Sequence, residues 1–349
     1  MKKPSRRTAL AVSGLVAVGT ALGTAAARRR GTAVRSVVAV PGDPGDALLA
    51  HPQAVHDEVD VSADDGARLH VRAYGDPDAD ILVLSHGWTC STDFWTPQIN
   101  AFAEKYRVVV YDQRGHGRSE TGSRVFGPDV LADDLAAVLA ATVPAGRRAV
   151  LAGHSMGGIS IMAWAERHPD QVRDKVSGVL LASTGMDNLV AASTIVPLPQ
   201  RAPRVPVPVA RRLMGATVPL VASSVTTRAI KYVALSPTAT PAAVAFCEKI
   251  VLGCPPRTRG GWGVALSALD VHLGLANLIV PTTVLVGSAD RLTPPSHAER
   301  LAAGLDEAGN LEHLVVVDGI GHMSSVEAID VFNFELEHLF ELAGQPVGS

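Results

Sequence analysis

The 349-residue chain has few cysteines and little net charge, and each shortage excludes a class of protein. Its three cysteines, Cys90, Cys247 and Cys254, are too few for a disulfide scaffold and lack the spacing of a zinc site. Cys247 and Cys254 could still pair in an oxidising compartment. The formal net charge of −3 gives no electrostatic case for a nucleic-acid partner. Without a phosphate-binding glycine loop or a metal-ligand cluster in the sequence, we expect neither a cofactor nor a metal.

Strand-like and helix-like patterns alternate along most of the chain. They predict an α/β fold with a mostly parallel sheet flanked by helices, and the length fits one large domain with an insertion. We predict the core in residues 56–186 and 276–345, and an antiparallel hairpin of residues 58–61 and 69–74 at the sheet edge. Helical patterns cover residues 129–143, 156–168, 296–305 and 325–342.

The regular alternation stops between residues 187 and 275, where proline, valine, alanine and basic residues are frequent. Residues 196–209 contain closely spaced prolines, which exclude a regular helix. Helical segments follow near residues 210–221 and 241–251. We interpret residues 187–275 as a helical cap over the edge of the sheet. Its apolar residues favour a hydrophobic substrate, and they fit simple packing of the cap on the sheet equally well.

The N-terminal segment, residues 1–30, combines a basic start with a mildly apolar run that ends in small residues. This pattern predicts an export signal, and the pair Arg6 and Arg7 is similar to a twin-arginine signal. A run of about twenty residues could also span a bilayer, so an uncleaved membrane anchor stays open. We expect an exported or membrane-associated protein rather than a cytoplasmic one. Residues 31–55 lack periodicity and are predicted to be a linker.

A G-x-S-x-G run, from Gly153 through Ser155 to Gly157, follows an apolar stretch and precedes a helical pattern. This context predicts a nucleophile elbow, a sharp strand-to-helix turn that presents the serine hydroxyl above the sheet. The N–H groups that begin such a helix face developing negative charge. Ser155 is therefore our candidate nucleophile.

Two residues after later strands complete an acyl-transfer site. Asp290 and His322 each follow an apolar strand, so both lie at the carboxyl edge of a parallel sheet with Ser155. A serine hydroxyl needs a base, and the base needs a partner that fixes its tautomer. We assign His322 as the general base and Asp290 as its orienting acid. Asp290 could instead cap the following helix, Asp187 is the reserve acid, and His313 is a weaker competitor for the base.

The strand-like residues 81–85 run into a His-Gly turn at His86 and Gly87. In elbow enzymes the oxyanion hole combines the N–H after the nucleophile with one from the loop after this strand. We therefore predict that the backbone groups of Met156 and Trp88 form the oxyanion hole. The predicted substrate pocket includes His86, Gly87 and His154.

These motifs, together with the Asp-x-Arg-Gly-His-Gly-x-Ser run of residues 112–119, resemble the α/β-hydrolase fold over residues 56–343. The likeness is to the large serine esterase, lipase and haloperoxidase-like group. It implies bracing roles for Asp112 and Arg114 beside the site. Epoxide hydrolases and haloalkane dehalogenases of this fold use an aspartate nucleophile, and the serine at position 155 argues against both.

The expected activity is hydrolysis of a small hydrophobic carboxylic ester by a Ser-His-Asp triad through an acyl-enzyme, as in carboxylesterases and lipases. Two alternatives use the same triad: a perhydrolase or haloperoxidase-like activity, and C–C bond hydrolysis. A third belongs to another class, a non-catalytic protein that binds ligands on the hydrolase fold.

Overall fold

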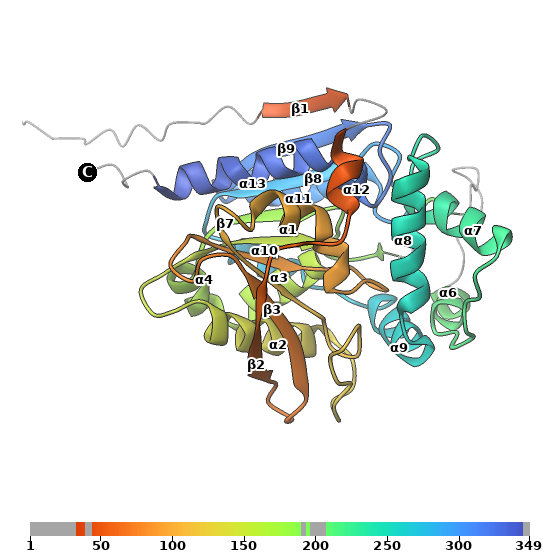
Figure 1. Ribbon diagram of the computed structural model, residues 1–349, viewed down its shortest axis with the longest axis horizontal. Coiled ribbons are helices and arrows are strands. Elements are labelled where there is room, and N and C mark those ends of the chain that lie inside the picture. The colour runs from red at the N-terminus through yellow and green to blue at the C-terminus, as the bar shows by residue number, and fades with distance from the viewer. Residues whose placement is uncertain (1–32, 39–43, 190–192, 196–206, 345–349) are drawn as a thin grey trace, which may run out of the picture. The chain divides into compact units, whose positions relative to one another are not determined.

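The computed structural model describes residues 33–38, 44–189, 193–195 and 207–344 (Figure 1). All of these belong to a unit that spans Thr32–Ser349. The predicted export signal or anchor, residues 1–30, lies outside the described residues, as do residues 196–206 of the proline-rich start of the cap. Within the described ranges, no helix has the length and apolar character needed to cross a membrane.

The described strands form a nine-stranded sheet in the order β1-β9-β8-β7-β6-β4-β5-β3-β2. All neighbouring strands run parallel except the pairs β2 with β3 and β3 with β5. The mostly parallel sheet with an edge hairpin is therefore as predicted. The strands are β1 (Ala33–Val38), β2 (His56–Ser62), β3 (Arg68–Tyr74), β4 (Ile81–Ser85), β5 (Arg107–Tyr111), β6 (Ala149–His154), β7 (Val176–Ala182), β8 (Thr282–Gly287) and β9 (Leu311–Asp318).

Part of the predicted linker is ordered structure, so that prediction is wrong over two segments. Strand β1 pairs in parallel with β9, from Ala33 opposite His313 to Val38 opposite Asp318. The short 3-10 helix η1 (Pro44–Leu49) follows, and the Asn100 amide donates hydrogen bonds to the carbonyls of Leu48 and Ala50. Strand β1 covers an edge that β9 would otherwise expose to other chains.

Alternation along the buried strands supplies two hydrophobic layers, one on each face of the sheet. In β4, Ile81 and Val83 pack with the helices α2, α3 and α11, whereas Leu82 and Leu84 pack with α1 and α13. Such continuous apolar strands are typical of a sheet covered on both faces. The helices of these layers are α1 (Thr96–Phe102), α2 (Pro128–Thr142), α3 (Met156–Arg167), α4 (Pro169–Lys175), α10 (His272–Ala276), α11 (Pro295–Glu307), α12 (Ser324–Glu327) and α13 (Ile329–Gly344).

Two predicted helices have different bounds in the structure. The pattern at residues 325–342 is interrupted at Ala328, whose φ of −138° and ψ of 54° separate α12 from α13. The predicted helix at residues 210–221 is α6 (Val207–Met214), which ends before Gly215. The other cap helices are α7 (Ser224–Ala234), α8 (Pro241–Gly253) and α9 (Pro256–Leu266), and Figure 1 shows them gathered with α6 on one side of the view.

The three cysteines are buried free thiols, which excludes the pairing of Cys247 with Cys254 in this structure. Cys247 lies within α8, and Cys254 is the C-cap residue of the same helix. Seven helical positions correspond to about 10 Å along the axis. A disulfide requires Cα atoms less than about 7 Å apart.

Two phenylalanines on opposite sides of α13 test how this helix packs on the sheet. Phe332 is fully buried, whereas Phe334 is 50% exposed. We expect Phe332→Ala to lower the free energy of unfolding by about 3–5 kcal/mol, because it leaves a cavity in a close-packed layer. Phe334→Ala should change it by less than about 1 kcal/mol. Urea unfolding followed by circular dichroism measures both values, and equal losses in the two variants would contradict the assignment of this layer.

Candidate active site

Ser155 lies at the turn between β6 and α3 with a strained backbone, as expected of a nucleophile elbow. Its φ of 52° and ψ of −114° fall in a region that residues with a side chain rarely adopt. Two hydrogen bonds hold this conformation: the Ser155 N–H donates to the Ala182 carbonyl at 2.9 Å, and the Thr184 hydroxyl donates to the Ser155 carbonyl at 2.7 Å. The residue is only partly buried, so reagents can reach it.

The glycines beside Ser155 are required by close packing. A Cβ atom on Gly157 would overlap the carbonyl oxygen of Ser85 at the end of β4. A Cβ on Gly153 would overlap the backbone of Gly157 and Gly158. Because α3 starts this close to β4, the turn that follows β4 approaches the elbow.

His322 and Asp290 form a buried hydrogen-bonded pair. The Nδ1–H of His322 donates to Asp290 Oδ2 at 2.8 Å, and the two side chains are 5% and 0% exposed. Asp290 also accepts hydrogen bonds from the backbone N–H groups of Leu292 and Thr293, each at 2.9 Å. The carboxylate therefore caps a local turn, although the N-cap residue of α11 is Pro294. The carboxylate of Asp290 therefore contacts both His322 and the turn that precedes α11.

Thr293 belongs to this site and was missed by the sequence analysis. Its hydroxyl donates to Asp290 Oδ2 at 2.9 Å and lies 3.3 Å from His322 Nδ1. The signal was present, because a hydroxyl residue three positions after an aspartate is typical of a turn closed by side-chain hydrogen bonds. The threonine therefore fixes the carboxylate that fixes the imidazole.

His154 supports the loop that carries His322. Its Nε2–H donates to the His322 carbonyl at 2.8 Å, and the two rings lie 4.9 Å apart between centroids. Burial, followed by the proximity of His322, lowers the pKa of His154 well below its ordinary value. The ring is therefore neutral, so it places no positive charge beside His322.

The turn after β4 lies against the elbow. A Cβ on Gly87 would meet the His154 ring and lie 3.3 Å from the Ser155 Cβ. The backbone N–H of Trp88, the next residue, is bonded to no acceptor among the described residues. The N–H groups that begin α3, with Met156 first, also lack intrahelical acceptors by the geometry of a helix start. Among the described residues, the N–H groups of Met156 and Trp88 thus lack backbone acceptors, and Trp88 follows the glycine that approaches Ser155.

The predicted pocket residues His86 and His154 lie behind the site surface. Both side chains are buried, with 0% and 1% of their surface exposed. His86 Nδ1–H donates to the Gly87 carbonyl at 2.8 Å, and its Nε2 accepts from the Gln113 N–H at 3.0 Å. The structure thus places these histidines as supports of the turn and the loop, while Gly87 lies at the close approach itself.

The loop of residues 112–119 is fixed by buried ion pairs. The Arg114 guanidinium donates to both oxygens of Asp134, at 2.9 and 2.6 Å, and to Asp65 at 2.7 Å. Asp112 accepts from the Thr92 N–H at 2.6 Å and contacts His70 at 2.7 Å. These contacts hold the neighbouring loops together, as the resemblance implied.

The reserve candidates are engaged elsewhere. Asp187 forms an ion pair with Arg300 at 2.5 Å, and His313 contacts Glu335 at 2.8 Å. His313 is at the start of β9, opposite the edge from which the loop of His322 leaves. Within the described residues, neither side chain forms a hydrogen bond with His322.

Glu327, which the sequence analysis also missed, connects the His322 loop to the cap. Its oxygens accept hydrogen bonds from the backbone N–H groups of Gly321 at 3.1 Å and Ser236 at 2.7 Å. The N–H of His322 itself donates to the Ala234 carbonyl at the end of α7 at 2.9 Å. Burial raises the pKa of Glu327 from 4.5 to about 7. The position of the loop that carries His322 therefore depends on the Glu327 carboxyl, whose pKa lies near neutrality.

The raised pKa predicts a pH-dependent stability. The folded protein binds a proton at Glu327 that the unfolded chain has lost, between pH 4.5 and about 7. This contribution to stability is therefore complete below pH 4.5 and is lost as the pH rises through about 7, with a size of about 3 kcal/mol. We expect the unfolding free energy of the wild type, minus that of Glu327→Gln, to fall over this window. Urea unfolding at a series of pH values measures it, and a constant difference would contradict the shift.

Comparison with known proteins places this geometry in a family. The sequence model of the alpha/beta hydrolase fold matches residues 80–328. Over 124 residues, 35% of this chain, the sequence is 37% identical to a bifunctional esterase/perhydrolase of Acinetobacter calcoaceticus. Over 108 residues, 31% of this chain, it is 37% identical to a non-heme chloroperoxidase of Streptomyces lividans. These segments span 43% and 38% of the two relatives.

A solved structure shows the same fold over a longer stretch. The thermophilic esterase of Thermogutta terrifontis, determined with malate bound, superposes with a TM-score of 0.66 and 22% identity. The match covers 84% of this chain and 100% of that esterase. With the family match over most of the chain and the nine-stranded sheet in agreement, this protein belongs to the α/β-hydrolase fold family.

Proposed function

We propose that this protein is a serine hydrolase that cleaves carboxylic esters through an acyl-enzyme. The observation that carries the proposal is the buried His322–Asp290 pair, 2.8 Å between Nδ1 and Oδ2, at the sheet edge where Ser155 has its strained turn. In this assignment Ser155 is the nucleophile, His322 the general base and then acid, and Asp290 the orienting acid.

The proposed reaction uses the two ring nitrogens of the His322 imidazole. His322 Nδ1–H is held by Asp290, which leaves Nε2 as the basic nitrogen that takes the Ser155 hydroxyl proton as the oxygen attacks the ester carbonyl. The N–H groups of Trp88 and Met156 stabilise the resulting oxyanion. Collapse expels the alcohol, which receives the proton from His322. Water, activated by the same nitrogen, then hydrolyses the acyl-enzyme and restores Ser155.

The cap supports a hydrophobic substrate. It contacts the site at three points: the Ala234 carbonyl on the His322 loop, the Ser236 N–H on Glu327, and the Arg259 carbonyl, which accepts from the Trp88 indole at 3.0 Å. An acyl chain bound above Ser155 would therefore lie between the oxyanion turn and apolar cap helices. We propose a small apolar ester as the substrate class.

Perhydrolysis is the second candidate, favoured by the relative that is described as a bifunctional esterase/perhydrolase. In that reaction hydrogen peroxide replaces water as the nucleophile that attacks the acyl-enzyme. The peroxide oxygen forms the new bond to the acyl carbon, the bond to Ser155 Oγ breaks, and the serine regains a proton. The product is a peroxyacid, so assaying peroxyacid release from an ester and hydrogen peroxide separates the two activities.

Hydrolysis of a p-nitrophenyl ester series from short to long acyl chains tests the nucleophile. We expect Ser155→Ala to lower kcat by at least about 10³-fold, because the acyl-enzyme can no longer form. Ser123→Ala, which removes a hydroxyl from an exposed loop, is the matched control and should keep full activity. Equal turnover by wild type and Ser155→Ala would refute the assignment, and no turnover of any ester would refute ester hydrolysis.

The orienting contacts predict graded effects on the same assay. Asp290→Asn should lower kcat by about 10³- to 10⁴-fold, because an amide can present a donor to Nδ1 and favour the wrong tautomer. Thr293→Val keeps the Asp290–His322 bond and removes one donor to the carboxylate, so a loss of about 10- to 100-fold is expected. The pH profile of kcat should also shift in Thr293→Val. A larger loss in Thr293→Val than in Asp290→Asn would contradict this order of roles.

A further inference from the structure

The cap differs from the rest of the chain in its charge. The cap, residues 187–275, contains nine lysines and arginines and three acidic residues, Asp187, Glu248 and Asp270, whereas the remainder contains 22 basic and 31 acidic residues. Residues 188–247 contain no aspartate or glutamate at all. The small net charge of the whole chain therefore conceals a basic cap on an acidic core.

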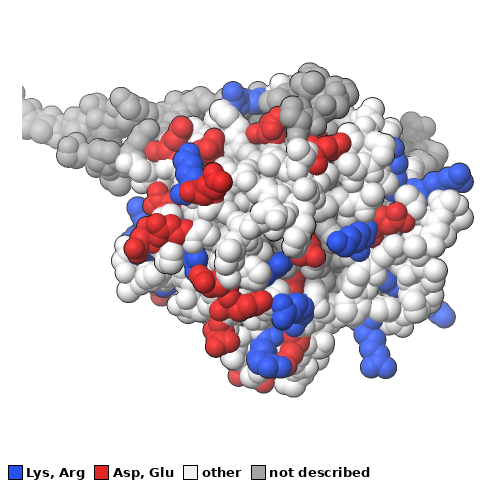
Figure 2. All heavy atoms as spheres, viewed as in Figure 1, with Lys and Arg blue, Asp and Glu red and all other residues white. Residues whose placement is uncertain are grey.

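Three cations of the cap are available to a partner. Arg211 and Arg212 in α6 and Arg228 in α7 are exposed, and none of them forms an ion pair within the described residues. Figure 2 shows the cap side of this face, at the right, with more blue than red, while the rest of the face mixes both signs.

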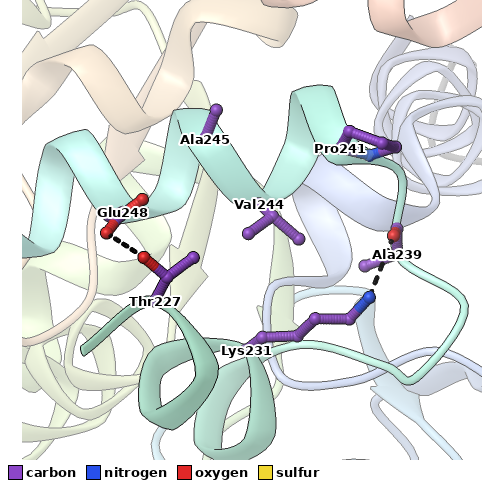
Figure 3. Close-up of a pocket in the computed structure, with 7 residues that line it drawn as sticks. All are labelled: Thr227, Lys231, Ala239, Pro241, Val244, Ala245 and Glu248. Atoms are coloured by element: carbon purple, nitrogen blue, oxygen red, sulfur yellow. Dashed lines mark hydrogen bonds between the residues drawn. The ribbon is translucent and has the colours of Figure 1, made fainter. Parts of the chain in front are cut away.

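The one acidic residue between Asp187 and Asp270 is already engaged. Glu248 accepts a hydrogen bond from the Thr227 hydroxyl at 2.6 Å, across a cavity of about 370 Å³ between α7 and α8 (Figure 3). In the same cavity Lys231 reaches toward the carbonyl of Ala239 at 3.5 Å. Glu248 therefore faces an internal partner rather than the three exposed arginines.

Exposed aliphatic side chains accompany these cations. Val218, Val221 and Val225 are 69%, 70% and 71% exposed, and Leu220 is 40% exposed. Single exposed apolar residues are ordinary, whereas a group of them within eight positions marks an interaction surface. Burial of such side chains is favourable in any apolar medium that meets them.

The same surface is connected to the proposed active site. The Arg259 guanidinium donates a hydrogen bond to the Val218 carbonyl, and the Arg259 carbonyl accepts from the Trp88 indole. At the other end of α7, the Ala234 carbonyl accepts from the N–H of His322. The exposed aliphatic residues are thus two contacts away from the predicted oxyanion turn.

We propose that Arg211, Arg212 and Arg228, with Val218, Leu220, Val221 and Val225, form a surface that docks on an anionic lipid bilayer. The aliphatic side chains enter the interface and the guanidinium groups contact headgroup phosphates. The absence of acids favours this occupant over an apolar protein partner, and the exposed valines favour it over a nucleic acid. If the proposed ester hydrolysis is correct, docking brings the oxyanion turn to esters held in the bilayer. The docking itself does not depend on catalysis.

Co-sedimentation with vesicles tests the surface. The Ser155→Ala protein is mixed with vesicles of phosphatidylcholine alone, or of phosphatidylcholine with phosphatidylglycerol, at low and high salt. Both the full chain and a form that begins at Thr32 are used, because the basic N-terminal segment binds anionic lipid by charge on its own. The form from Thr32 retains all strands of the sheet and both hydrophobic layers. We expect binding of this form to anionic vesicles only, weakened as salt screens the arginines.

Two pairs of variants, all made in the form from Thr32, separate the contributions. Arg211→Gln with Arg212→Gln should weaken binding about 25-fold, at about fivefold for each charge near the surface. Arg148→Gln with Arg173→Gln, two exposed arginines of the core, should change it less than twofold. Val218→Ser with Val221→Ser should weaken binding at least about tenfold, and Val55→Ser, at an 87% exposed valine, should not.

The outcomes decide the proposal without reference to activity. Loss of binding in the cap variants alone, with unchanged circular dichroism and unfolding midpoint, supports it. Equal binding to neutral and anionic vesicles, or equal loss in cap and control variants, overturns it. Self-association that Val218→Ser with Val221→Ser abolishes, without vesicle binding, overturns it in favour of a second copy of the chain. A protein that hydrolyses esters and does not bind vesicles supports the proposed function and refutes the docking surface.

Discussion

The close approach of α3 to the end of β4 is the constraint on which the site depends. The chain reverses from β6 into α3 within one residue, and Ser155 takes a positive φ to allow it. Such a conformation costs about 1–3 kcal/mol, and it persists only where surrounding contacts fix it. Here those contacts are the bonds to Ala182 and Thr184 and the absence of a Cβ at Gly157. Contacts with the carboxyl ends of β7 and β4, the two neighbours of β6 in the sheet, therefore maintain the strained conformation of Ser155.

The parallel sheet turns this local constraint into a site. Because β4, β6, β8 and β9 run in the same direction, the segments that follow them share one edge. Contacts between those segments then fix their relative positions: His154 after β6 bonds to the His322 loop after β9, and His322 bonds to Asp290 after β8. A buried, neutral His154 makes this connection without adding charge beside the proposed base.

Local sequence was sufficient to predict a feature of the structure where a few consecutive residues determine its conformation. Gly153 to Gly157 predicted the elbow because the turn and the helix start are both encoded within a few residues. Partners distant in sequence were not predictable in the same way. Strand β1 has no alternating pattern of its own, and its order depends on β9, almost 280 positions later along the chain. Glu327 is separated from Ser236 by two strands and four helices, so no spacing in the sequence relates them.

Hydrogen bonds of mostly neutral groups help to attach the cap to the core. Several contacts between the described cap and the core are hydrogen bonds of neutral donors, such as the Trp88 indole to the Arg259 carbonyl, the Thr258 hydroxyl to the Gly115 carbonyl and the Trp262 indole to the Arg114 carbonyl. Charged groups take part at three further points, where Glu327 accepts from the Ser236 N–H, Asp46 accepts from the Thr240 hydroxyl and Arg291 donates to the Tyr232 carbonyl. None of these bonds joins two charged groups. Neutral bonds of this kind are insensitive to salt, whereas ion pairs between an acidic core and a basic cap would be screened. The cap can therefore keep its position on the sheet edge while its arginines serve contacts outside the chain. The charge separation between cap and core is thus compatible with a stable fold. Neither the attachment of the cap nor the turn at Ser155 depends on attraction between the opposite charges of cap and core.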